Sequence, residues 1–298
     1  MVLDIESFQG SPEKPAVIFV HGLGMDKNIW VAPFRSRVLG GMFRLQVLVS
    51  RYASGNARLL QTLFHDLRAR DYPVITWSQQ RLSNRIEAVI PELSAVAGIA
   101  RRMSDVGIII IGHSRGGLIA RKYLSKTDNS VRGLITIATP HAGSAIAKMA
   151  QYIAPIASFL GPLAAKGDKN ISRALTRISE FLQSKALQEL LPGSTFFQTL
   201  QDSPRAGVSY ISAGGTNPML FCFSSLSFPG IFETIIPENL FPDEMKRGKG
   251  DGLVSAESSK IPWADEHFSF DCNHAEILFD KEAREICTNA VERLVHNH

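Results

Sequence analysis

The sequence has few cysteines and no long apolar run, and each absence excludes a class of protein. Only three cysteines occur in 298 residues, too few and too dispersed for a disulfide framework or a metal cluster. No stretch of about 18 residues is wholly apolar, so we expect no membrane-spanning helix. The first residues lack the basic segment and apolar core of a secretory signal. These absences favour a cytoplasmic chain, although a secreted chain with its leader removed would look the same.

The charged residues form no basic block. Lys and Arg number 32 against 28 Asp and Glu, a formal net charge of +4. Such a small, scattered excess gives no reason to expect nucleic acid as a partner. With 45% hydrophobic and 20% charged residues, the composition is that of a globular enzyme with one sizeable α/β core.

The clearest local signal lies between residues 106 and 124. The apolar run 108–111 is typical of a buried parallel strand, and Gly112-His113-Ser114-Arg115-Gly116 fits the pattern G-x-S-x-G. A nucleophile on a sharp strand-to-helix turn leaves no room for side chains two residues away, which explains the glycines. Ser114 is therefore the predicted nucleophile, near a helix N-terminus that favours negative charge. The alternative is a glycine-rich turn with an inert capping serine.

A second glycine-containing loop, His21-Gly22-Leu23-Gly24, follows a predicted strand. Ester hydrolysis creates an oxyanion, which a preorganised pair of N–H groups stabilises best. We expect one N–H from Arg115, directly after the nucleophile, and the other from Leu23. We also expect His113, beside the nucleophile, to bind substrate.

Two later loops provide candidates for an acid and a base. Asp251 stands between glycines in the segment 248–255, and His274 lies between the last predicted strand and the final helix. A hydrolytic site of this kind needs a carboxylate that orients an imidazole, and an imidazole that takes the serine proton. The chain order Ser, Asp, His is also the one typical of this architecture. The alternative for Asp251 is an ordinary Asp-Gly turn.

Strands alternate with helices along the chain, which predicts a parallel sheet with right-handed crossovers. The predicted strands are 16–20, 73–77, 108–111, 131–138, 208–213 and 267–272. The predicted helices are 56–70, a helix from Ser83 with a kink at Pro91, and 281–295. His141 ends the fourth strand, and we expect it to be structural rather than the base.

Residues 144–200 interrupt this alternation and are far longer than an ordinary connection of about 4–6 residues. Their apolar helical pattern predicts a cap or lid over the site, in which Met149, Ile153 and Phe159 bind an acyl chain. The alternative is additional core. The hydrolase core then comprises residues 1–143 and 201–298, with a second apolar excursion at 216–249. The cap is also the surface expected to touch a lipid interface transiently.

Taken in order, these motifs resemble the α/β-hydrolases, and more narrowly the bacterial lipase group. The resemblance is carried by H-G-L-G at 21–24, G-H-S-R-G-G at 112–117, T-P-H-A-G-S at 139–144, D-G-L-V-S at 251–255 and C-N-H at 272–274. It implies an α/β-hydrolase fold and a serine-dependent carboxylic ester hydrolase that needs no cofactor. Its substrate would be a small-molecule ester or a lipid. Many secreted members bind calcium beside the histidine loop, but Glu276 has no second acid at a matching place, so we expect no metal.

Two other functions would use the same fold. An acyltransferase would form the same acyl-enzyme and pass the acyl group to an alcohol. A non-catalytic binder of lipid or of a partner protein would not react with a fluorophosphonate probe.

Overall fold

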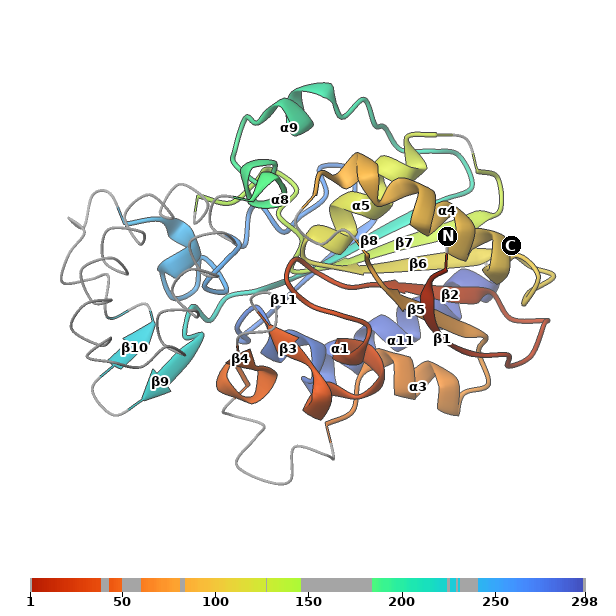
Figure 1. Ribbon diagram of the computed structural model, residues 1–298, viewed down its shortest axis with the longest axis horizontal. Helices are drawn as coiled ribbons and strands as arrows, with labels where there is room; N and C mark the ends of the chain where they lie inside the picture. Colours follow the sequence, from red (N-terminus) through yellow and green to blue (C-terminus); the bar gives the residue numbers. More distant parts are fainter. Residues whose placement is uncertain are drawn as a thin grey trace.

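The computed structural model contains a seven-stranded sheet in the order β1-β5-β2-β6-β7-β8-β11, with helices on both faces (Figure 1). The edge strand β1 (Asp4–Phe8) runs antiparallel to β5 (Val74–Ser78). The other neighbours, from β5 to β11, are parallel. The structure describes residues 2–38, 43–49, 60–80, 84–126, 128–145, 184–223, 226–228, 230 and 241–296. The predicted mostly parallel α/β fold is confirmed.

The parallel strands lie close to their predicted positions. They are β2 (Ala16–Val20), β5, β6 (Ile108–His113), β7 (Val131–Ile137), β8 (Ser209–Gly215) and β11 (Glu266–Phe270). Because they are parallel, the loops that follow them meet at one edge of the sheet, where ligands bind in open α/β folds. The edge strand β1 is not among the predicted strands, because it is half exposed and has no continuous apolar run.

Alternate residues of each strand enter two different cores, as the period of two requires. Val17 and Phe19 of β2 face the layer of α1 (Asn28–Val31), α3 (Leu63–Ala69) and α11 (Lys281–His296). Ala16 and Ile18 face α4 (Ile90–Ala100) and α5 (Arg115–Leu124) on the other side. The two helical layers lie above and below the sheet in Figure 1.

The prediction of a helix kinked at Pro91 is wrong. A 3-10 turn, η4 (Ile86–Ala88), precedes α4, and Pro91 lies in the first turn of that helix. A proline is tolerated there, because its missing N–H would have no helical acceptor in any case. Of the predicted helix 56–70, residues 56–59 lie outside the described residues and the remainder forms α3. The final helix is close to its prediction.

Most of the predicted cap, 146–183, lies outside the described residues, and so do Met149, Ile153 and Phe159. Its described end forms α8 (Lys185–Gln188) and α9 (Thr195–Thr199), and contributes Leu190 and Phe196 to the core shared with α4 and α5. This end therefore packs onto the core through a few side chains, and the cap over the site stays a prediction.

The described parts of the second excursion include a short hairpin of β9 (Phe221–Phe223) and β10 (Leu226–Phe228). Another short pair, β3 (Arg37–Val38) and β4 (Phe43–Arg44), lies outside the main sheet. Within the described ranges, no helix combines the length and the apolar character that crossing a membrane demands.

Candidate active site

Ser114 lies in the turn between β6 and α5, with φ 54° and ψ −129°. A positive φ is unusual for serine and costs free energy that the surroundings must supply. The turn is crowded: a Cβ on Gly116 would lie 2.3 Å from the carbonyl oxygen of Val20, and one on Gly112 would lie 2.5 Å from the backbone of Gly117. Close backbone packing thus explains the glycines of the motif.

The loops after β8 and β11 bring Asp251 and His274 together. His274 Nδ1 lies 2.9 Å from Asp251 Oδ2, and the His274 N–H donates to the Asp251 carbonyl at 2.9 Å. The other carboxylate oxygen, Oδ1, accepts the N–H groups of Leu253 at 2.9 Å and Val254 at 2.7 Å. An ionised carboxylate only accepts hydrogen bonds, so the imidazole proton lies on Nδ1 and Nε2 can act as a base.

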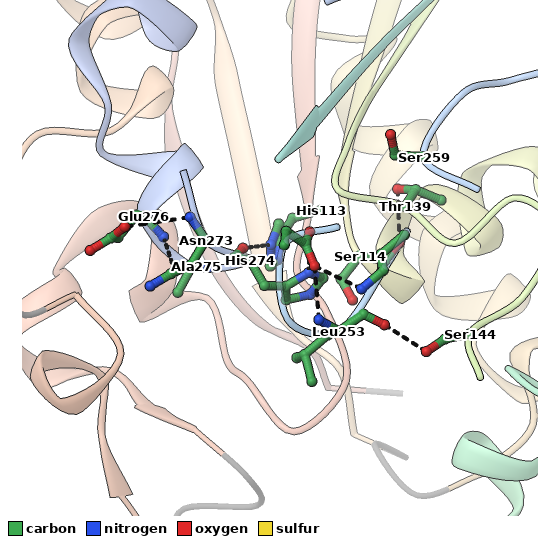
Figure 2. Close-up of polar contacts among 12 residues, drawn as sticks. His113, Ser114, Thr139, Ser144, Leu253, Ser259, Asn273, His274, Ala275 and Glu276 are labelled. Atoms are coloured by element: carbon green, nitrogen blue, oxygen red, sulfur yellow. Dashed lines mark hydrogen bonds and ion pairs between the residues drawn. The ribbon is translucent and has the colours of Figure 1, made fainter. Parts of the chain in front are cut away.

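Ser114 lies beside this pair. The ring of His113, its neighbour in sequence, is 4.9 Å from the ring of His274, centroid to centroid, and Figure 2 shows Ser114 and His274 in the same small region. The hydrogen bonds among the described residues do not include one from the Ser114 hydroxyl to His274. Without substrate, such catalytic hydrogen bonds are often long. The serine–imidazole contact therefore stays a prediction.

His113 is fully buried, and its Nε2 lies 2.9 Å from the carbonyl oxygen of His274. A carbonyl can only accept, so Nε2 carries the proton and donates. Burial, together with the neighbouring His274, lowers the pKa of His113 to about 3, which keeps the ring neutral. With no exposed surface, the His113 ring supports the histidine loop, and its predicted contact with substrate stays a prediction.

The loop 21–24 packs directly against the nucleophile, since a Cβ on Gly22 would lie 2.9 Å from the Cβ of Ser114. The buried ring of His21 holds this loop: its Nε2 accepts the Gln79 N–H at 3.0 Å, and its Nδ1 donates to the Gly22 carbonyl at 3.0 Å. Burial lowers the pKa of His21 to about 4, so this neutral tautomer persists at neutral pH.

The two predicted oxyanion donors lie on these neighbouring turns. In the described part of the chain, neither the N–H of Leu23 nor that of Arg115 donates to a backbone or side-chain acceptor. Arg115 is the first residue of α5, where N–H groups have no helical partner. Both N–H groups are therefore available, and their role as an oxyanion hole stays a prediction.

The position of the Arg115 side chain has no local signal in the sequence. It is fully buried, donates from Nη2 to the Asn84 carbonyl, and lies 4.0 Å from Glu189. Burial lowers the pKa of Arg115 to about 10 and raises that of Glu189 to about 7. Arg115, the residue after the nucleophile, thus contacts Glu189, which directly follows α8.

Asn273 is a second residue whose role the sequence did not reveal. Its Nδ2 donates to the carbonyls of Leu48 at 2.9 Å and Met219 at 2.8 Å, and its Oδ1 accepts the N–H groups of Ala275 and Glu276, each at 2.9 Å. The Asn–Ala–Glu contacts are visible in Figure 2. Asparagine side chains often accept the N–H groups two and three residues ahead and so stabilise tight turns. An asparagine directly before the candidate catalytic histidine, in a predicted loop, is the signal that indicates this turn.

His141 is buried in a structural network, in keeping with its predicted role. Arg121 donates to its Nδ1 at 3.0 Å, so Nε2 carries the proton and donates to Thr136 Oγ1 at 3.0 Å. Burial and the Arg121 charge hold the pKa of His141 well below its usual value. Arg121 is itself paired with Asp202 at 2.7 Å.

Among the residues that the structure describes, no three His, Cys, Asp or Glu side chains are grouped to hold a metal ion. The Glu276 carboxylate instead accepts the N–H of Asn273 at 3.4 Å.

Solved structures with the same architecture include a lipase of Bacillus licheniformis, BlEst2. Its propeptide form has 17% sequence identity and a TM-score of 0.62, covering 96% of this chain and 53% of that one. Its mature form has 16% identity and a TM-score of 0.60, covering 96% of this chain and 97% of that one. A carboxylesterase structure from Nitrososphaera gargenis has 14% identity and a TM-score of 0.52, covering 99% and 96%. At such identities the likeness shows the fold alone.

No curated protein matches the sequence. The family model described as "Alpha/beta hydrolase family" matches residues 17–257, well over half of the chain, including the Ser114 turn and Asp251. The sheet order, the strained serine turn and this match agree: the chain belongs to the alpha/beta hydrolase family.

Proposed function

We propose that the protein is a serine carboxylic ester hydrolase of the lipase or esterase type, acting through an acyl-enzyme. The observation that carries the proposal is the 2.9 Å hydrogen bond between Asp251 and His274 beside a serine with φ 54°. A buried carboxylate that orients a histidine next to a strained serine is the arrangement that activates a hydroxyl for attack. Membership of the alpha/beta hydrolase family supports it.

The steps follow from the positions of the groups. Ser114 Oγ attacks the ester carbonyl carbon while His274 Nε2 takes the serine proton, and Asp251 stabilises the imidazolium through Nδ1. The N–H groups of Leu23 and Arg115 bind the oxyanion. The tetrahedral intermediate then expels the alcohol, which takes the proton from His274. Water, deprotonated by His274, finally attacks the acyl-enzyme and releases the acid and free Ser114.

The proposed substrates are small esters or lipids with an apolar acyl chain. This part of the proposal rests on the apolar sequence of 144–200, where Met149, Ile153 and Phe159 would contact the chain. A series of p-nitrophenyl esters of increasing chain length tests it, and turnover should rise with chain length before it falls. A rate increase at the micelle concentration would indicate a lipase, and plain saturation an esterase.

The central test is the loss of the nucleophile. We expect Ser114→Ala to abolish ester turnover and labelling by a fluorophosphonate, since no other group then forms the acyl-enzyme. Ser125→Ala is a suitable control, because its hydroxyl donates only to the Lys122 carbonyl at the far end of α5. Turnover retained in Ser114→Ala, or a wild type that is not labelled, would contradict the proposal. Transfer of the acyl group to an added alcohol in preference to water would instead identify an acyltransferase.

A further inference from the structure

The peptide between Leu253 and Val254 lies at the centre of the acid loop. Its N–H, on Val254, donates to Asp251 Oδ1 at 2.7 Å. Its carbonyl, on Leu253, accepts a hydrogen bond from the Ser144 hydroxyl at 2.6 Å. One peptide group therefore joins Ser144 to the carboxylate of Asp251, and the other oxygen of that carboxylate holds His274. Figure 2 shows Ser144 and His274 on opposite sides of Leu253.

Ser144 is itself held firmly. It is buried, with 5% of its surface exposed, and its N–H donates to the Leu190 carbonyl at 2.7 Å. The next residue, Ala145, donates to Glu244 Oε1 at 2.7 Å. The backbone that carries the Ser144 hydroxyl is therefore held on both sides. The Leu253 carbonyl that the hydroxyl contacts lies 109 residues further along the chain.

The preceding residues join the same two loops. The His141 N–H donates to the Ser258 carbonyl at 2.7 Å, and the Ser258 hydroxyl donates to the Gly143 carbonyl at 2.7 Å. Several hydrogen bonds thus join the segment 139–144 to the loop that carries Asp251. The proposed catalytic steps do not use the motif of this segment.

We propose that Ser144 is a positioning residue for Asp251, acting through the Leu253–Val254 peptide; this inference rests on the proposed ester hydrolase function. Hydrogen bonds in a chain polarise one another, so the Ser144 bond strengthens the N–H that Val254 presents to the carboxylate. It also fixes the tilt of that peptide, and with it the rotation of the carboxylate that faces His274. In this role Ser144 acts through Asp251 and not by contact with the substrate.

Loss of the hydroxyl leaves the half-buried Leu253 carbonyl without this partner, and the peptide can rotate. A small misplacement of an orienting group reduces the rate of the chemical step and leaves substrate binding almost unchanged. We therefore expect Ser144→Ala to lower kcat by about tenfold, with KM within about twofold of the wild type.

The test compares Ser144→Thr with Ser144→Val, which have nearly the same shape and differ in the hydroxyl. Threonine should restore most of kcat, and valine should resemble alanine. Ser259→Ala is the matched control, because that buried hydroxyl donates to the Ala256 carbonyl in the same loop and has no link to Asp251. Its kcat should stay within about twofold of the wild type. All rates are expressed per site titrated with a fluorophosphonate, so that unfolded protein does not contribute.

Equal kcat values for the threonine and valine variants, or an unchanged kcat in Ser144→Ala, would overturn the inference while the ester hydrolase proposal stands. A wild type that neither hydrolyses esters nor is labelled would overturn both. A common loss of kcat in Ser144→Ala and Ser259→Ala would show that the loop responds to any lost hydroxyl, and would also count against a specific role for Ser144.

Discussion

The turn after β6 and the loop after β8 carry two of the candidate catalytic groups, and they are held in different ways. Around Ser114, the backbones of Gly116 and Val20 approach so closely that a single methyl group would not fit. Around Asp251, hydrogen bonds arrive from Ser144, Leu253 and Val254. The first region is fixed by steric exclusion between closely packed backbones, and the second by hydrogen bonds. Mutations should therefore affect the two regions differently.

The largest expected effect is that of Asp251→Asn on catalysis. The N–H groups of Leu253 and Val254 will keep an oxygen at the Oδ1 position, so the new amide group faces His274. Nδ1 must then accept, the imidazole proton moves to Nε2, and His274 can no longer take the serine proton. We expect kcat to fall by about 10⁴-fold with the fold retained. The measurement is ester turnover together with circular dichroism.

Asp271→Asn is the control for that change, since Asp271 is an exposed acid at the start of the histidine loop, paired with Arg247 at 3.0 Å. Surface ion pairs contribute little, so its kcat should remain close to the wild type. A comparable loss of kcat in both variants would show that charge in general, rather than the orientation of the imidazole, decides the rate.

The second prediction tests the steric side of the comparison. Gly116→Ala places a methyl group 2.3 Å from the Val20 carbonyl oxygen, and backbone atoms cannot move aside cheaply. We expect a loss of roughly 3 kcal/mol in the free energy of unfolding, measured by urea denaturation. Gly98→Ala is the control: in α4 its nearest neighbour would be Arg101 Nη2 at 3.9 Å, so the helix should become slightly more stable. Equal stability of the two variants would refute the steric explanation.

The difference between a contiguous turn and a contact between separate loops also explains which features of the site the sequence predicts. The run from Ile108 to Gly117 contains the strand, the turn and the glycines that the turn requires, so its conformation follows from neighbouring residues. The contact of Ser144 with Leu253 depends on how two separate loops meet, and no local pattern reports it. The glycines that frame Asp251 predict its place in the site, whereas no local pattern indicates that Asn273 contacts Leu48 and Met219.

The predictions at Pro91 and His113 both follow from neighbouring residues in the sequence. The kink at Pro91 was expected because the apolar period continues on both sides, yet the 3-10 turn before α4 moves the helix start to Ile90. The substrate contact predicted for His113 follows from its position beside Ser114, and it stays a prediction. Neighbouring residues at a strand end point in opposite directions, which places the His113 ring in the interior.

The smallest effect concerns His113, whose hydrogen bond to the His274 carbonyl joins the turn after β6 to the histidine loop, and His274 is bonded in turn to Asp251. Because burial lowers the pKa of His113 to about 3, protons bind the unfolded chain first as the pH falls. The contribution of the neutral ring to stability is complete above an unfolded pKa of about 6.5 and is lost progressively as the pH falls from there towards 3.

His113→Gln keeps an N–H donor but does not titrate. The wild type should therefore lose about 2 kcal/mol more than the variant between pH 7 and pH 5, measured as the free energy of unfolding in urea. Titration of groups away from His113 cancels in that difference, and equal slopes in the two proteins would mean that the ring gains its proton at the same pH in the folded and unfolded chains, which would contradict burial of a neutral ring.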